Sequence, residues 1–94
     1  MTISEREVEA ALDAYLDEHC RWLYRRSTDK RWWEICRDND PLGPIGSDTI
    51  TVIARLDCSN EDAQAECGNI RNRRAVTAAL LAAQRVREEQ ANGE

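Results

Sequence analysis

The sequence predicts a small α+β domain built from an N-terminal helix, a two-stranded antiparallel hairpin and a C-terminal helix. Apolar residues recur at three- and four-residue spacing near both ends of the chain, and they alternate with other residues over 49–56. The chain has 94 residues, and the 37 before and 46 after a Pro/Gly-rich loop at 38–48 are each too few for a separate core. We therefore expect one domain over residues 1–94, with a polar, frayed tail at 88–94.

The first helix is predicted to begin at Ser4. Ser4 followed by Glu7 matches a capping box, in which each side chain bonds the other residue's free backbone N–H. The apolar face that follows consists of Val8, Leu12, Tyr15, Leu16, His19 and Leu23. Acidic residues dominate the start of this segment and Arg21, Arg25 and Arg26 its end, an order that complements the helix dipole.

The clearest strand is the segment TITVIARL at 49–56, in which Ile50, Val52, Ala54 and Leu56 alternate with the other residues. A lone strand leaves its backbone groups unpaired, so it needs a neighbour. Residues 31–37 are the partner within the chain, although 30–37 also fits helical spacing. The alternative is a mainly α fold in which residues 49–56 pair with the same strand of a second copy.

A second helix is predicted after Ser59, which forms another cap with Asp62. Gly68 and Asn69 allow a break or kink. A further helical stretch would then begin near Asn69 or Asn72, with an apolar stripe at Val76, Ala79, Leu80, Ala83 and Val86.

Composition excludes several classes of protein. Residues are 33% charged and 41% hydrophobic, and the longest apolar run has six residues, whereas a membrane span needs about 20. The acidic N-terminus does not resemble a signal peptide. We therefore expect no membrane association and a cytoplasmic protein, located in the host cytosol if a phage encodes it.

No metal, cofactor or catalytic activity is expected. Separations of 16, 22 and 9 residues between Cys20, Cys36, Cys58 and Cys67 do not give the short ligand pairs of a zinc site, so reduced, buried thiols are the better interpretation. The chain has one histidine, His19, and no nucleophile, metalloprotease or phosphate-loop motif. The sequence therefore predicts a protein that is not an enzyme.

The first candidate partner surface is an acidic ridge on the N-terminal helix. Its residues recur every four positions and so share one side of the helix: Glu5, Glu9, Asp13 and Asp17. Like charges at this spacing are locally unfavourable. The ridge is either a surface for an electrostatic partner or an ordinary solvated face.

The second candidate is an aromatic–basic patch, composed of Trp22, Arg25, Arg26, Lys30, Arg31, Trp32 and Trp33. Arg and Trp dominate the hot spots of protein interfaces, and the same pair can stack on single-stranded nucleic acid. Since the chain lacks Phe, some of these tryptophans are also needed in the core, and we expect one core and one partly exposed tryptophan.

The third candidate is an anion site at Arg71, Arg73 and Arg74. If a helix begins near Asn69 or Asn72, its free N–H groups and these arginines converge. Ion pairing with the acidic residues of the chain is the simpler alternative.

Charge is arranged in alternating blocks. The net charge is -5, but residues 1–18 contain six acidic and one basic residue, whereas residues 67–87 contain five basic and no acidic residues. Such blocks can pair within the fold, between copies or with a partner. A patchy protein-binding surface is therefore better supported than a uniformly acidic nucleic-acid mimic.

These features predict a non-catalytic inhibitor or adaptor that blocks a larger protein or protein complex by steric and electrostatic binding. The short, acidic profile without an enzyme motif is similar in style to small phage-encoded inhibitors of bacterial defence, such as anti-CRISPR proteins, although no specific residues carry the comparison. The alternative is a module that binds nucleic acid or a small nucleotide through its Arg and Trp residues. A homodimer is the other expected assembly, because so small a core gains from association.

Overall fold

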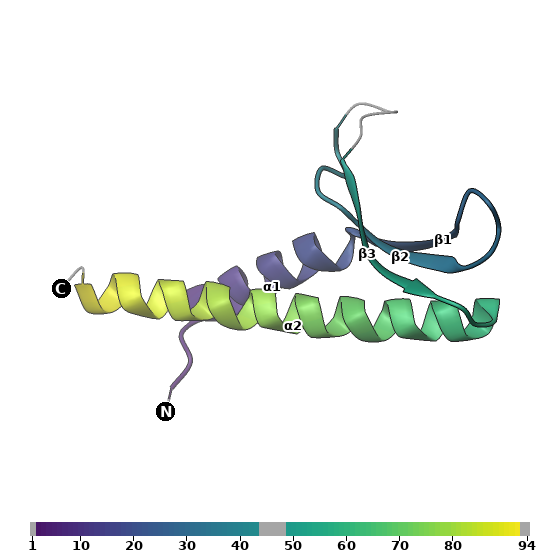
Figure 1. Ribbon diagram of the computed structural model, residues 1–94. Helices are drawn as coiled ribbons and strands as arrows, with labels where there is room; N and C mark the ends of the chain where they lie inside the picture. The colour runs from purple at the N-terminus through teal and green to yellow at the C-terminus, as the bar shows by residue number, and fades with distance from the viewer. Residues whose placement is uncertain (1, 44–48, 93–94) are drawn as a thin grey trace. The chain divides into compact units, whose positions relative to one another are not determined.

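The computed structural model describes residues 2–43 and 49–92 and confirms the α+β class (Figure 1). In chain order the elements are α1 (Glu5–His19), β1 (Trp22–Arg26), β2 (Trp33–Asp38), β3 (Ile50–Leu56) and α2 (Asn60–Asn92). Part of the predicted loop, residues 44–48, lies outside the described residues.

The contacts within the chain define two compact units. The helical unit contains α1 and the part of α2 from residue 72 onward. The sheet unit, residues 20–71, contains the three strands and the first part of α2. Each unit has its own packing.

Helix α1 begins as predicted, because the backbone N–H of Glu7 donates to Ser4 Oγ at 3.2 Å. It ends earlier than the apolar spacing predicted. His19 is its last residue, and Leu23, expected on the helix, lies in β1. The segment Trp22-Leu23-Tyr24 consists largely of aromatic residues that favour strands, and here this preference prevails over the continuing helical period.

The sheet is antiparallel, with the order β1-β2-β3. The predicted hairpin is confirmed, since β2 pairs with β3 and Ile35 lies opposite Ala54. The register shifts between Ile35 and Cys36, as a β-bulge does. Because β1 adds a third strand, the prediction of two strands was incomplete, and the mainly α alternative was wrong.

A small apolar core lies within the sheet unit. Trp22, Ile35 and Cys67 are buried together, so residues from β1, β2 and α2 meet there. Side chains packed around them are Tyr24, Ala54, Leu56 and Ile70. In a chain without Phe, the indole of Trp22 supplies much of the core volume.

Helix α2 starts with the predicted cap, in which the N–H of Asp62 donates to Ser59 Oγ at 3.1 Å. It then continues unbroken through Gly68 to Asn92. Of the two alternatives predicted at Gly68 and Asn69, a break or a kink, the break was therefore wrong: one glycine costs a helix only about 1 kcal/mol, which a long helix with many other good helix formers tolerates. The tail predicted to fray is helical from Glu88 to Asn92.

In the helical unit the two helices are antiparallel. Glu7, near the start of α1, accepts a hydrogen bond from Arg87, near the end of α2, at 2.9 Å. In this part of α2, a small residue is buried and larger ones are exposed: Ala75 is fully buried, whereas Leu80 and Leu81 are exposed. Among the described residues, no helix is long and apolar enough to cross a membrane.

Candidate protein-binding surface on the sheet

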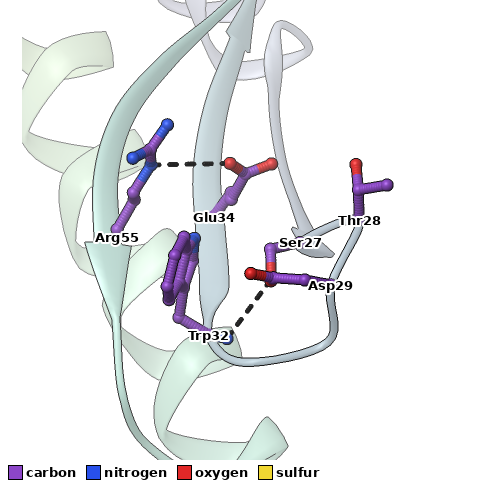
Figure 2. Close-up of a pocket in the computed structure, with 6 residues that line it drawn as sticks. All are labelled: Ser27, Thr28, Asp29, Trp32, Glu34 and Arg55. Carbon is purple, nitrogen blue, oxygen red and sulfur yellow. Dashed lines mark hydrogen bonds and ion pairs between the residues drawn. The ribbon is translucent and has the colours of Figure 1, made fainter.

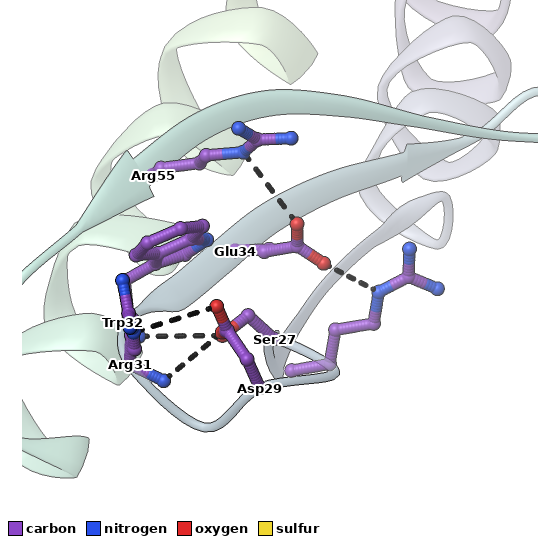
Figure 3. Close-up of polar contacts among 7 residues, drawn as sticks. Ser27, Asp29, Arg31, Trp32, Glu34 and Arg55 are labelled. Atoms are coloured by element: carbon purple, nitrogen blue, oxygen red, sulfur yellow. Dashed lines mark hydrogen bonds and ion pairs between the residues drawn. The ribbon is translucent and has the colours of Figure 1, made fainter.

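Three charged residues form a ladder across the sheet. Arg25 of β1 lies opposite Glu34 of β2, and Glu34 lies opposite Arg55 of β3. Because directly opposite residues of neighbouring strands share one face, all three side chains project from the same side of the sheet. The Glu34 carboxylate contacts Nε of Arg25 at 3.1 Å. It also contacts Nε of Arg55 at 3.6 Å (Figure 3).

Burial differs sharply along this ladder. The Glu34 side chain is 12% exposed, whereas those of Arg25 and Arg55 are 47% and 63% exposed. One nearly buried carboxylate thus holds two guanidinium groups at the surface. Because there are two cations and one anion, the ladder carries a net charge of +1.

Trp32 extends the ladder at its edge. The guanidinium of Arg55 lies over the Trp32 ring, 5.5 Å from its centroid, in a cation–π contact. The same two residues line an open pocket of about 400 Å³, shown in Figure 2. The other lining residues are Ser27, Thr28, Asp29 and Glu34.

The pocket wall is formed by the tight β1–β2 turn. Ser27 is buried, and its hydroxyl donates to Asp29 Oδ1 at 2.8 Å and accepts from the N–H of Trp32 at 3.3 Å. The N–H of Ser27 also donates to the carbonyl of Trp32 at 3.0 Å. Lys30 closes the turn in the left-handed region, with φ of 61°. These bonds hold the backbone at Trp32 beside the charged ladder.

The predicted aromatic–basic patch does not form one surface. Trp22 is 7% exposed and belongs to the core, so its assignment to a partner surface was wrong. Arg26 lies opposite Trp33 in the register and its guanidinium stands 5.0 Å from the Trp33 ring centroid. Because neighbouring strand residues point to opposite faces, Arg26 and Trp33 project from the side opposite Arg25 and Glu34.

The remaining patch residues lie at the turn. Lys30 and Arg31 are exposed, and Arg31 Nε is 3.7 Å from Asp29 Oδ2. Trp32 and Trp33 are both half-buried, and Tyr24 packs against Trp33 with ring centroids 5.6 Å apart. The expectation of one core tryptophan is confirmed by Trp22.

Sequence reasoning missed Glu34 and Arg55 as members of this site. Arg55 is one of the residues that alternate with the apolar positions of the strand at 49–56. That alternation already indicated a side chain pointing away from the core. Glu34 could have been found from the same period in WEICRD, since it precedes the buried Ile35.

The acidic ridge lies on α1, and its four residues are exposed: Glu5, Glu9, Asp13 and Asp17. All four belong to one continuous helix, so their spacing places them along one side. The ridge therefore belongs to the helical unit, whereas the charged ladder belongs to the sheet unit.

The anion site predicted at Arg71, Arg73 and Arg74 lacks its structural basis. No helix begins near these arginines, because α2 starts at Asn60 and runs through them. The backbone N–H groups there lie inside a helix rather than at its free N-terminus. Successive helical residues are 100° apart, so Arg73 and Arg74 also point in different directions.

The four cysteines, Cys20, Cys36, Cys58 and Cys67, are not joined in disulfides. In the described ranges, no group of three His, Cys, Asp or Glu residues could hold a metal ion. Burial raises the pKa of the Cys36 and Cys67 thiols. Burial and the nearby carboxylates, of which Asp62 has the largest effect, raise the pKa of Cys58.

Comparison with known proteins assigns no family to the chain. No protein-family model matches it. Searches of the curated proteins and of the solved structures likewise give no match.

Proposed function

We propose that this chain is a non-enzymatic protein-interaction module, an inhibitor or adaptor, that binds a larger protein through the open face of its sheet. The binding surface would consist of Arg25, Arg55 and Trp32, with Glu34 beneath them and the 27–32 turn beside them. The observation that carries this proposal is the single carboxylate of Glu34 that holds two exposed arginines next to a half-buried tryptophan.

The chemistry of this surface favours protein recognition. Arg and Trp are the residues most enriched in interface hot spots. Immobilising a flexible side chain on binding costs about 0.5–1.5 kcal/mol. Glu34 and the Trp32 ring already restrict the Arg25 and Arg55 side chains, so part of this cost is met before a partner arrives.

The charge of the surface indicates the chemistry of the partner. With its net positive charge, the ladder would attract a segment containing Asp or Glu carboxylates, which bind guanidinium groups through two parallel hydrogen bonds. The partner would be blocked sterically by the small domain placed over that segment.

A non-catalytic role is supported by the groups that could otherwise react. The thiolate is the reactive form of cysteine, and the raised pKa values of Cys36, Cys58 and Cys67 disfavour it. His19, the one histidine of the sequence, stacks on Tyr15 with ring centroids 5.6 Å apart. It lies in α1 of the helical unit and contributes nothing to the pocket in the sheet unit.

The test is affinity capture followed by measured binding. The full chain, the R25A/R55A variant and the control Arg85→Ala would each be used to capture proteins from a lysate of the source cell, and affinity for the captured protein would be measured by calorimetry. Arg85 is an exposed arginine of α2 outside the sheet unit. We expect the double variant to bind at least tenfold more weakly and the control to bind within twofold of the natural chain. Equal affinity of both variants would contradict the proposed surface.

Nucleic-acid binding is the second candidate function, favoured by the contact between Arg55 and the ring of Trp32. This hypothesis predicts that affinity falls steeply as the salt concentration rises. Basic side chains release counterions from the phosphates on binding, and this release is less favourable at higher salt. Fluorescence anisotropy with a labelled single-stranded oligonucleotide at 20 mM and 200 mM salt, where the Debye length is about 20 Å and about 7 Å, measures that dependence. Absence of binding at the lower concentration would exclude this alternative.

A further inference from the structure

The helical unit leaves its larger aliphatic side chains at the surface. On α1, Val8, Leu12 and Leu16 are 54%, 55% and 56% exposed, and on α2 Val76 and Leu80 are 49% and 67% exposed. Several of them line one groove of about 410 Å³ between the two helices, in which Glu7 is the only charged lining residue. Isolated exposed aliphatics are ordinary, but a continuous apolar groove indicates an interaction site.

Charged residues of opposite sign border this apolar groove. On α1, Glu5, Glu9 and Asp13 each lie three residues before a member of the Val8–Leu12–Leu16 row and therefore next to it on the helix surface. On α2, Arg73 and Arg87 lie seven residues before and after Leu80, and therefore on nearly the same line along the helix. Glu88, beside Arg87, is the acidic residue at the end of this line. The α1 rim is thus acidic, and the α2 rim carries two arginines and one carboxylate.

We infer that the occupant of this groove is a second copy of the same chain, docked with its own groove in a twofold-symmetric dimer. A twofold axis parallel to the helices places α1 of one copy against α2 of the other. Such an isologous contact brings each acidic rim to the basic rim of the other copy. The four helices then form an antiparallel four-helix bundle in which Val8, Leu12, Leu16, Val76 and Leu80 are buried.

The helix register supports this pairing. Glu7 and Arg87 share a hydrogen bond, so they lie at about the same height along the helix axes. The rise of 1.5 Å per residue places Glu5 and Glu9 within about 3 Å of that height. Because the twofold axis is parallel to the helices, Arg87 in the dimer lies at the height of Glu5 and Glu9 of the second copy. A guanidinium has five N–H donors, so Arg87 can bond its own Glu7 and a carboxylate across the interface.

The aliphatic side chains and the charged rims together offer enough area for a small dimer interface. A side chain of this size exposes on the order of 100 Å² when it is half to two thirds exposed. The five aliphatic residues and the charged rims together approach the roughly 800 Å² that each partner buries in a standard interface. This dimer goes beyond the proposed function, because it uses none of the sheet residues that are proposed to bind a larger protein.

The experiment measures the mass of the full chain in solution by sedimentation equilibrium over a range of concentrations. The test variant is Leu80→Glu, and Leu81→Glu is its matched control: Leu81 is also exposed, at 49%, but 100° further around α2 and outside the groove lining. We expect a dimer for the natural chain, a dissociation constant raised at least tenfold by Leu80→Glu, and a change of less than twofold for the control.

A second variant keeps the test decisive if Leu80→Glu perturbs the fold, which circular dichroism would reveal. Leu12→Glu introduces the same charge on the other helix and should also give monomers. Glu9→Arg, which alters only the acidic rim, should raise the dissociation constant about threefold to tenfold. A natural chain that stays monomeric at 0.1 mM (a concentration about a hundredfold above a micromolar dissociation constant) would overturn the inference, as would a dimer that neither Leu80→Glu nor Leu12→Glu weakens.

Discussion

Glu7 and Arg87 are 80 residues apart in the sequence and share a hydrogen bond of 2.9 Å that joins α1 to α2. The Glu7 side chain is 5% exposed and that of Arg87 is 51% exposed. The hydrogen bond from Arg87 is the main reason why the pKa of Glu7 lies below its ordinary value, and bonds from Ser4 lower it further. Glu7, which was predicted only as part of a helix cap, therefore also links the two helices of the helical unit.

This ion pair should make stability depend on pH. Because the pKa of Glu7 is lower in the folded than in the unfolded chain, the stabilisation from its ion pair is complete above the unfolded value of about 4.5 and is lost as pH falls through the folded value. We expect Glu7→Gln to have a lower melting temperature than the natural chain at pH 7. The difference between the two melting temperatures should become smaller as the pH is lowered to 3.

The control for this experiment is Glu9→Gln, which removes an exposed carboxylate of the same helix. Asp38, whose pKa is lowered chiefly by a hydrogen bond from Thr49, titrates in the same direction and is present in both variants. A constant difference in melting temperature between Glu7→Gln and the natural chain from pH 7 to pH 3 would contradict the assignment.

Glu34 is expected to be the most sensitive member of the charged ladder. Substitution Glu34→Gln removes the anion that holds Arg25 and Arg55 and leaves two like charges on adjacent sides of a nearly buried amide. Hydrogen bonds to charged groups contribute about 1.5–3 kcal/mol, and solvent screening at the half-exposed arginines reduces this, so we expect a loss of about 1 kcal/mol in urea unfolding. Glu89→Gln, an exposed change in α2, should cost less than half as much.

The sequence predicted the elements that have strong local signals. Ser4 and Ser59 marked both helix starts, because a cap depends on residues only three apart. Alternation at 49–56 and the need for a pairing partner identified β3 and β2. Strand β1 was missed because Leu23 continued the helical spacing, and only pairing with β2 at Cys36 decides between the two structures.

The site was less accessible to prediction, because it depends on strand register. Arg25, Glu34 and Arg55 are far apart in the sequence and meet only when three strands align. The predicted patch instead grouped residues by their proximity in the sequence, which placed Trp22 and Trp33 on the same surface as Arg25. Alternation across the sheet separates them.

Gly68 offers a stabilising substitution. It lies inside α2, and an added Cβ would have Arg71 Nη2 as its nearest neighbour, at 3.9 Å, which is an ordinary van der Waals contact. Alanine restricts the unfolded chain without straining the helix, so Gly68→Ala should stabilise the protein by about 0.5–1 kcal/mol in urea unfolding. Gly43→Ala is the contrasting variant, since its Cβ would collide with Asp40, and it should not stabilise. A loss of stability in Gly68→Ala would contradict this prediction and show that a neighbouring group lies too close to Gly68 for a Cβ atom.

The four thiols should react at rates that follow their burial. Cys20 is exposed and Cys58 half-buried, whereas Cys36 and Cys67 are buried, with burial raising the pKa of both buried thiols. Because the thiolate is the nucleophile, we expect maleimide to modify Cys20 first, then Cys58, and to reach Cys36 and Cys67 only when the sheet unit opens. Mass spectrometry of peptides from timed samples measures the order. In 6 M urea (enough to unfold a small domain of ordinary stability, at roughly 1 kcal/mol per molar) the four rates should converge. Rapid modification of Cys36 in the folded chain would contradict the burial that joins β2 to the core.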